Sequence, residues 1–182
     1  MVDILDDKGN KTGQVLTRSE SHAKNLWHPI IHLWIFNLKG EILMQRRSAN
    51  KPVFPDVWDV AVGGHVSAGE SPQDAVIKEA QEELGIKIDK QKFKFICKTR
   101  FGTKMPDGWV NNIFIWSYIT KMDIQIAELK LQEEEVSGAK WFSLDELDKM
   151  LNNPAETEDF SPDIVDDSKV VIAEIRKNWG EL

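Results

Sequence analysis

The sequence predicts one α/β domain of the α+β type, in which a mixed β-sheet packs between helices. Strand-like apolar runs dominate the first 120 residues, a single amphipathic helix interrupts them, and two more helices follow after residue 143. Because strands and helices do not alternate regularly, a mixed sheet fits better than a parallel one. A chain of this length can bury roughly 70% of its unfolded surface. We therefore treat residues 1–182 as one domain.

The N-terminal part, residues 1–28, reads as a hairpin followed by a connector. Residues 2–5 and 14–16 flank an Asp, Gly and Asn-containing stretch that is typical of a turn. Residues 18–26 are polar, and we expect a connecting segment there.

The central sheet is predicted from six strand-like segments. Residues 30–36 are nearly all apolar, which indicates a strand buried on both faces, and His32 within it is expected to be a hydrogen-bonded core residue. The other expected strands are residues 42–46, 58–62, 93–101 and 110–120, with a short one at 139–142.

Three helices follow from capping patterns. Ser71 and Pro72 resemble an N-cap and first helical residue, and Gly85 is placed to end that helix. Residues 143–182 supply a helix beginning near Ser143 and a last one from Ser161, whose buried side would be Val165, Ile172, Ile175 and Trp179. Residues 152–167 are acidic and contain prolines, so we expect a mobile surface loop there.

The first of these helices would carry three carboxylates on one face. Glu79, Glu82 and Glu83 fall within roughly 100° of arc, while Ile77, Ala80 and Leu84 can pack against the sheet. Like charges at this spacing repel, and a divalent cation such as Mg²⁺ removes that penalty. We expect the carboxylates to face solvent. The alternative is an ordinary solvated acidic face.

Residues 64–86 resemble the motif G-x5-E-x7-R-E-U-x-E-E-x-G-U of the Nudix family, where U is aliphatic. Lys78 stands where the family has Arg, and the strict matches are Gly64, Glu70, Glu79, Glu82, Glu83 and Gly85. This resemblance implies an α/β/α sandwich with a mixed central sheet. It also implies Mg²⁺- or Mn²⁺-dependent hydrolysis of a diphosphate (pyrophosphate) linkage in a small molecule. A nucleoside diphosphate derivative is the expected substrate.

The family resemblance also assigns roles. Glu82 and Glu83 would be the principal metal ligands, assisted by the Gly64 carbonyl and Glu70. Glu79 would bind metal or orient and deprotonate the attacking water, and Lys78 would reach Glu82 one turn on. Glu135, six residues before Trp141, is the best match for an extra metal ligand or base, although a solvated acidic turn is equally consistent with it.

Residues 2–90 further resemble the isopentenyl-diphosphate isomerase branch, which implies two groups of site residues. In the isomerase, histidines matching His28 and His65 and one near His22 ligate a metal. Arg47 and Lys51 would contact phosphate, with solvated loop charges as the alternative. His65 follows the motif glycine and is expected to line the substrate site, whereas each histidine alone is also consistent with a structural role. Separately, Trp109 lies in a loop and is our candidate for stacking on a flat group.

Isomerase activity is the main alternative to hydrolysis. The isomerase uses a cysteine where this chain has Gly63, and it has non-acidic residues where this chain has Glu79 and Glu82. Cys97 lies on a different expected strand. These differences favour the hydrolase. A non-catalytic Nudix-fold sensor of nucleotide metabolites is a second alternative, which the intact glutamate set disfavours.

Composition excludes several classes of protein. A net charge of −7 argues against a nucleic-acid or anionic membrane partner, and no apolar run reaches the roughly 18 residues of a membrane helix. The single cysteine excludes an internal disulfide and fits a reducing compartment. The N-terminus lacks the pattern of a signal peptide. We expect a cytoplasmic protein, and the sequence leaves a homodimer open.

Overall fold

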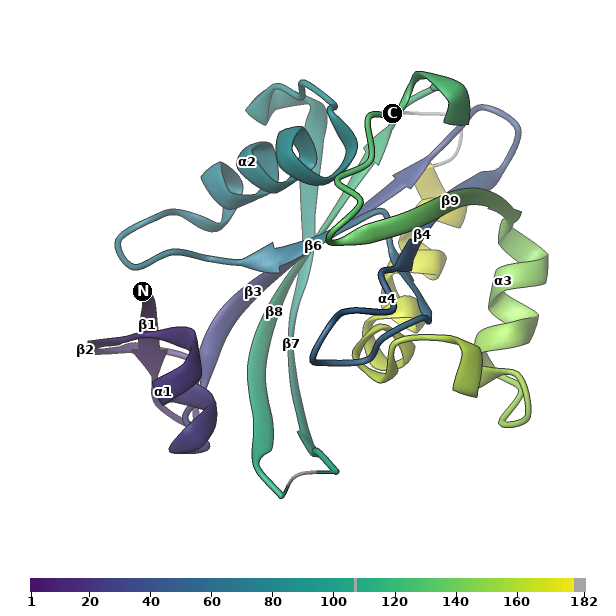
Figure 1. Cartoon of the computed structure of the whole chain (residues 1–182). Coiled ribbons are helices and arrows are strands. Elements are labelled where there is room, and N and C mark those ends of the chain that lie inside the picture. The colour runs from purple at the N-terminus through teal and green to yellow at the C-terminus, as the bar shows by residue number, and fades with distance from the viewer. Residues whose placement is uncertain (107, 179–182) are drawn as a thin grey trace.

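The computed structural model describes residues 1–106 and 108–178, and it shows an α/β/α sandwich (Figure 1). The helices are α1 (Arg18–Ala23), α2 (Pro72–Leu84), α3 (Leu144–Leu151) and α4 (Pro162–Asn178). A separate hairpin consists of β1 (Val2–Leu5) and β2 (Lys11–Leu16). The strands of the main sheet are β3 (His28–Phe36), β4 (Glu41–Arg47), β5 (Trp58–Val60), β6 (Val62–His65), β7 (Phe93–Lys104), β8 (Val110–Lys121) and β9 (Val136–Ser143). The predicted fold class is confirmed.

Strand β3 is the centre of the sandwich, and every one of its residues is buried. Successive side chains of a strand point to opposite faces. Ile31, Leu33 and Ile35 therefore pack with α2, whereas Trp34 and Phe36 pack with α3 and α4. The prediction of a strand buried on both faces is confirmed.

The sheet is mixed, as predicted. Strand β8 runs parallel to β3 along its whole length, beginning with the pair His28 and Ile113. The remaining pairings are antiparallel. The second edge of β3 is shared, because Ile35 pairs with Leu43 of β4 whereas Ile31 pairs with Gly64 of β6. Strands β4 and β6 therefore pair with different parts of the same edge of β3.

Helix α2 begins and ends where the capping residues predict. The Ser71 hydroxyl accepts a hydrogen bond from the Asp74 backbone N–H at 3.2 Å, and Pro72 occupies the first turn. Gly85 adopts a left-handed φ of 70°, which ends the helix without the steric penalty of a side chain.

Two local predictions are wrong. Residues 18–26 are not only a connector, because α1 forms there. Its N-cap Thr17 and Glu20 make a capping box, a local pattern that outweighs the polar composition. Residues 58–62 are not one strand, because the pairing passes from β4 to β3 at this point and divides the segment into β5 and β6.

A third prediction, a mobile surface loop at residues 152–167, is also wrong for its second half. Residues 157–159 form a short 3-10 helix, and α4 already begins at Pro162. Phe160, Ile164 and Asp167 are buried because they pack beneath the sheet. On α4, Ile172 and Ile175 are buried, as predicted, and Val165 is half-buried. Trp179 lies outside the described residues.

No helix in the part of the chain that the structure describes is long and apolar enough to cross a membrane.

Candidate active site

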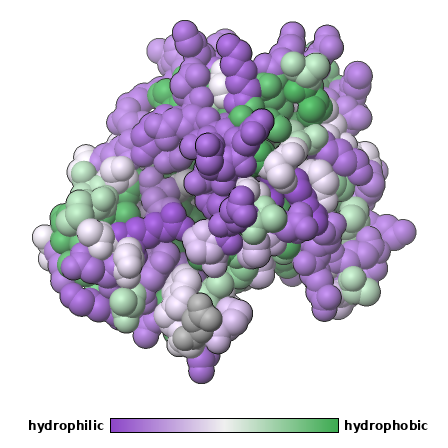
Figure 2. Space-filling view, viewed as in Figure 1, coloured by the Kyte–Doolittle hydropathy of each residue, from purple (hydrophilic) through white to green (hydrophobic). Residues whose placement is uncertain are grey.

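One cleft of about 340 Å³ collects most of the predicted site residues. Helix α2, strand β6, the β4–β5 loop and helix α1 surround it, and Figure 2 shows that this side of the molecule is mostly hydrophilic. The predicted residues that line it are His22, Arg47, Lys51, Gly64, His65, Lys78, Glu79, Glu82, Glu83 and Glu135. The described lining does not include Glu70 or Trp109.

Glu83 lies under the helix rather than in solvent. Glu83 is only 5% exposed. Its carboxylate accepts hydrogen bonds from the Gly63 backbone N–H and the Gln45 amide, both at 3.2 Å. The expectation that it faces solvent is wrong because the glycines of β6 let the strand approach α2 closely. A Cβ on Gly64 would clash with the Glu79 side chain.

Two carboxyl groups of the acidic face, those of Glu79 and Glu83, have raised pKa values. Burial, then the neighbouring charges of Glu79 and Asp59, raises the pKa of Glu83 to about 8. Burial also raises the pKa of Glu79, although the Lys78 ammonium opposes that shift. A hard divalent cation prefers carboxylate oxygens and would relieve both costs, so the donor set fits Mg²⁺ or Mn²⁺.

Lys78 joins two motif carboxylates. Its ammonium lies 3.1 Å from Glu79 and 3.2 Å from Glu70, whereas the predicted contact with Glu82 is absent among the described residues. Glu70 also accepts the Ser67 backbone N–H at 2.8 Å. Lys78 therefore links Glu79 on α2 to Glu70 in the loop that precedes this helix.

Three cationic side chains, those of Arg47, Lys51 and Arg18, line the cleft with the acidic helix. The Arg47 guanidinium donates to the backbone oxygens of Phe54 and Val53 and to Asp59, each at 2.8 Å, so it supports its own loop as well as lining the cleft. Lys51 forms an ion pair with Glu135, and burial followed by the charges of Arg47 and Arg18 lowers its pKa to about 8.

Arg18 is a cleft residue that the sequence reasoning missed. It extends from the first turn of α1, and burial followed by the nearby Arg47 lowers its pKa. The Thr17–Glu20 capping box was the signal that could have placed a helix there, with Arg18 on its first turn.

The three histidines of the isomerase resemblance converge. The Nε2 atoms of His22 and His28 are 3.3 Å apart, and the rings of His28 and His65 stack with centroids 5.2 Å apart. Burial lowers the pKa of His22 and of His28 to about 4 and that of His65 well below its usual value. Neutral imidazoles with ring nitrogens within 4.8 Å of one another fit a metal ion.

Trp109 stacks on His22, with ring centroids 4.5 Å apart and planes 15° apart. One face of the indole is thus already covered, which differs from the expected free stacking surface. Cys97 is half-buried on β7 and is not among the described residues of the cleft.

Comparison with known proteins identifies the family of the chain. An uncharacterized Nudix hydrolase of Listeria monocytogenes is 36% identical over 151 residues, 83% of this chain and 84% of the relative. An isopentenyl-diphosphate Delta-isomerase of Shigella boydii is 30% identical over 141 residues, 78% of this chain and 75% of the isomerase. A solved structure from Deinococcus radiodurans has a TM-score of 0.72 at 24% identity, covering 92% of this chain and 96% of that one. Residues 26–164 match the NUDIX domain, and the chain belongs to the Nudix hydrolase family.

Proposed function

We propose that the protein is a Mg²⁺- or Mn²⁺-dependent hydrolase that cleaves a diphosphate linkage, in a nucleoside diphosphate derivative, by attack of water on phosphorus. The observation that carries the proposal is the opposition of charges across one cleft. Glu79, Glu82 and Glu83 line the cleft from α2, whereas Arg18 lines it from α1 and Lys51 from the β4–β5 loop. Carboxylates suit the cation, and the cationic side chains suit the phosphates it would neutralise.

Each residue has a distinct role in this proposal. Glu82 and Glu83 would hold the cation, with the Gly64 carbonyl as a further contributor. Glu70 would contribute only after its ion pair with Lys78 opens. When bound, the cation neutralises phosphate charge and lowers the pKa of water. Glu79, positioned by Lys78, orients or deprotonates the attacking water. Glu135 is a further ligand or base once its ion pair with Lys51 opens.

The isomerase remains the second candidate because the His22, His28 and His65 cluster is assembled. Against it stand Gly63 at the position of the isomerase cysteine and the complete glutamate set in the cleft. A sensor that only binds a nucleotide metabolite would not require that set.

A panel of diphosphates assayed with and without Mg²⁺ separates the three functions. We expect phosphate-bond hydrolysis only with Mg²⁺ or Mn²⁺, and a rise in the unfolding temperature on adding either ion, because ligands that bind the folded state stabilise it. Isopentenyl diphosphate should not be interconverted with dimethylallyl diphosphate. Binding without turnover across the panel would instead indicate a sensor, and double-bond isomerisation would indicate the second candidate.

Lys78→Arg should raise kcat modestly. A guanidinium can donate to Glu70 and Glu79 at the same time through its planar fork, which the single ammonium does less rigidly. We expect about a 2- to 10-fold increase, which corresponds to ~0.4–1.4 kcal/mol. Lys78→Ala should lower kcat by more than that, whereas Lys87→Ala, an exposed lysine just beyond α2, should leave it unchanged. Full activity of Lys78→Ala would show that Lys78 is only a surface charge.

A further inference from the structure

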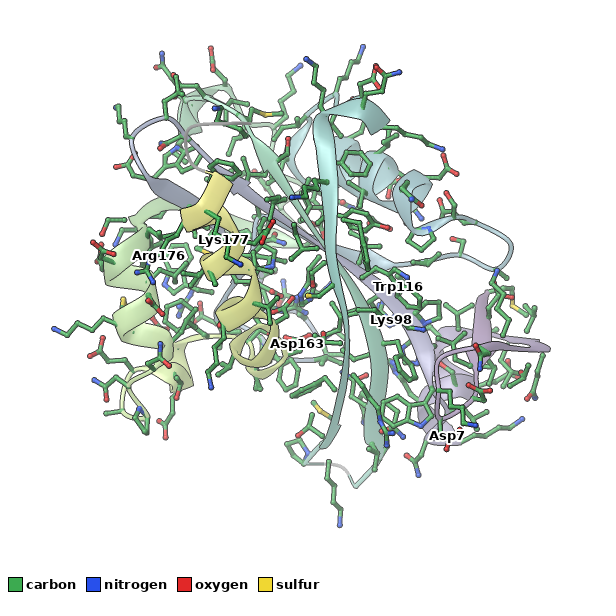
Figure 3. The ribbon with its side chains drawn as sticks, turned by 180° about the vertical axis from the view of Figure 1, so that it is seen from behind. Asp7, Lys98, Trp116, Asp163, Arg176 and Lys177 are labelled. Carbon is green, nitrogen blue, oxygen red and sulfur yellow. The ribbon has the colours of Figure 1, made fainter. Side chains whose placement is uncertain are left out.

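A second group of ionisable side chains lies on the floor of the cleft. His32 comes from β3, Asp59 from β5 and Asp163 from the first turn of α4, and all three line the cleft while being at least nine-tenths buried. Figure 3 shows Asp163 where the start of α4 meets the sheet. None of these residues belongs to the Nudix motif or to the histidine cluster.

His32 is held in one orientation by Asp167. The ring Nδ1 lies 3.1 Å from the Asp167 carboxylate, which also accepts the Ser117 hydroxyl at 2.5 Å. A carboxylate on one imidazole nitrogen fixes the tautomer and directs the other nitrogen as a metal ligand. In this chain the other nitrogen, Nε2, points toward Asp163.

Nε2 of His32 has no hydrogen-bond partner among the described residues. Its nearest carboxylate oxygen, on Asp163, is 3.9 Å away, which is longer than an N–H···O hydrogen bond. That separation is compatible with two ligand atoms each about 2.0–2.2 Å from a shared ion. One ligand atom from each of His32, Asp59 and Asp163 lies within 4.8 Å of the others.

When the His32 imidazole is neutral, as a metal ligand must be, the group has more buried negative charge than Arg47 alone offsets. Asp59 is paired with Arg47 at 2.8 Å, whereas Asp163 accepts a side-chain hydrogen bond, within the described part of the chain, only from the neutral hydroxyl of Ser161. The second oxygen of Asp167 is buried, and no donor from the described residues reaches it. A surplus of buried acceptors is costly unless a cation or water is present.

We propose that His32, Asp59 and Asp163 bind a divalent transition-metal ion such as Mn²⁺ or Zn²⁺, separate from the ion assigned to Glu82 and Glu83. Mixed imidazole and carboxylate donors suit such ions better than Mg²⁺. Asp167 is the outer carboxylate that orients His32. Because Asp163 lies on α4, the ion would tie this helix to the cleft floor. The site does not depend on the hydrolase proposal, since it is defined by metal binding alone.

Co²⁺ is the probe, because a nitrogen-containing site of low coordination number gives it a visible absorption spectrum. The background variant carries His22→Gln and Glu82→Gln, which weaken the two other candidate ion sites. We expect it to bind one Co²⁺ per chain, with a rise in unfolding temperature. Adding Asp163→Asn should weaken binding by ~10-fold or more, whereas adding Asp123→Asn, an exposed aspartate, should not. Equal Co²⁺ binding by both triple variants would overturn the proposal.

A measurement on the unaltered chain guards against a variant that fails to fold. In nitrogen-detected NMR at neutral pH, Zn²⁺ should shift the Nε2 resonance of His32 while Nδ1 stays protonated. An imidazole that remains doubly protonated throughout the titration would mean that a proton on His32 is the cation of this cluster, and the metal site would be rejected. Hydrolase activity plays no part in either experiment.

Discussion

Glu83→Gln should reduce diphosphate hydrolysis by about 10³-fold, because loss of an ion ligand removes several kcal/mol of transition-state charge stabilisation. The fold should survive, since the new amide can still accept the hydrogen bonds from Gly63 and Gln45. Initial rates at saturating Mg²⁺, together with circular dichroism, measure both effects.

Glu134→Gln is the matched control for this experiment. Glu134 is exposed and carries no assigned role, so its substitution should leave kcat within a factor of two of the parent, as expected for a surface change. Parent-like turnover of Glu83→Gln at saturating Mg²⁺ would contradict the ligand assignment. An unfolded variant would show instead that burial of this carboxyl matters more for stability than for metal binding.

The second large effect concerns the stability of the metal-free protein at alkaline pH. The folded pKa of Glu83, about 8, exceeds its unfolded value, so the folded state binds the proton more tightly. The corresponding stability is fully present below pH 4.5 and is lost as pH rises to about 8. By linkage, a shift of this size amounts to a few kcal/mol. In EDTA, Glu83→Gln should therefore be more stable than the parent at pH 8–9.

Denaturant unfolding of both proteins from pH 5 to pH 9 tests this expectation. Burial lowers the pKa of His32, but the carboxylates of Asp167 and Asp163 raise it to about 9. Deprotonation of His32 therefore also reduces the stability of the folded protein at alkaline pH. That contribution is common to both proteins and cancels in their difference. Mg²⁺ should restore the parent at pH 8 and leave the variant nearly unchanged. Parallel stability curves in EDTA would mean that Glu83 ionises normally in the folded protein.

The elements that could be predicted are those whose signals are local in the sequence. The two ends of α2 are fixed by Ser71, Pro72 and Gly85 through contacts within a few residues. The burial of β3 follows from its nearly continuous run of apolar residues. The placement of Glu79, Glu82 and Glu83 on one side of α2 follows from helix geometry alone. These predictions needed no knowledge of the rest of the chain.

What could not be predicted depends on contacts between distant segments. The burial of Glu83 requires β6 and Gln45 of β4 to meet α2, and nothing near residue 83 encodes that approach. Residues 152–167 were expected to form a loop because they are acidic and contain prolines, although α4 begins at Pro162. Asp167 is instead buried against His32, from which it is separated by most of the chain. Buried charge can only be interpreted once its partner is known.

The parallel pair of β3 and β8 has a consequence for how the protein folds. His28 pairs with Ile113, so pairing these two central strands closes a long loop of the chain. Contacts between residues far apart in sequence slow folding, because the entropy of closing the loop is lost before the contact forms. Until β8 docks, one edge of β3 stays unpaired, and such edges promote aggregation. The refolding yield should therefore fall as protein concentration rises, whereas the specific activity of the folded protein should not change over the same range.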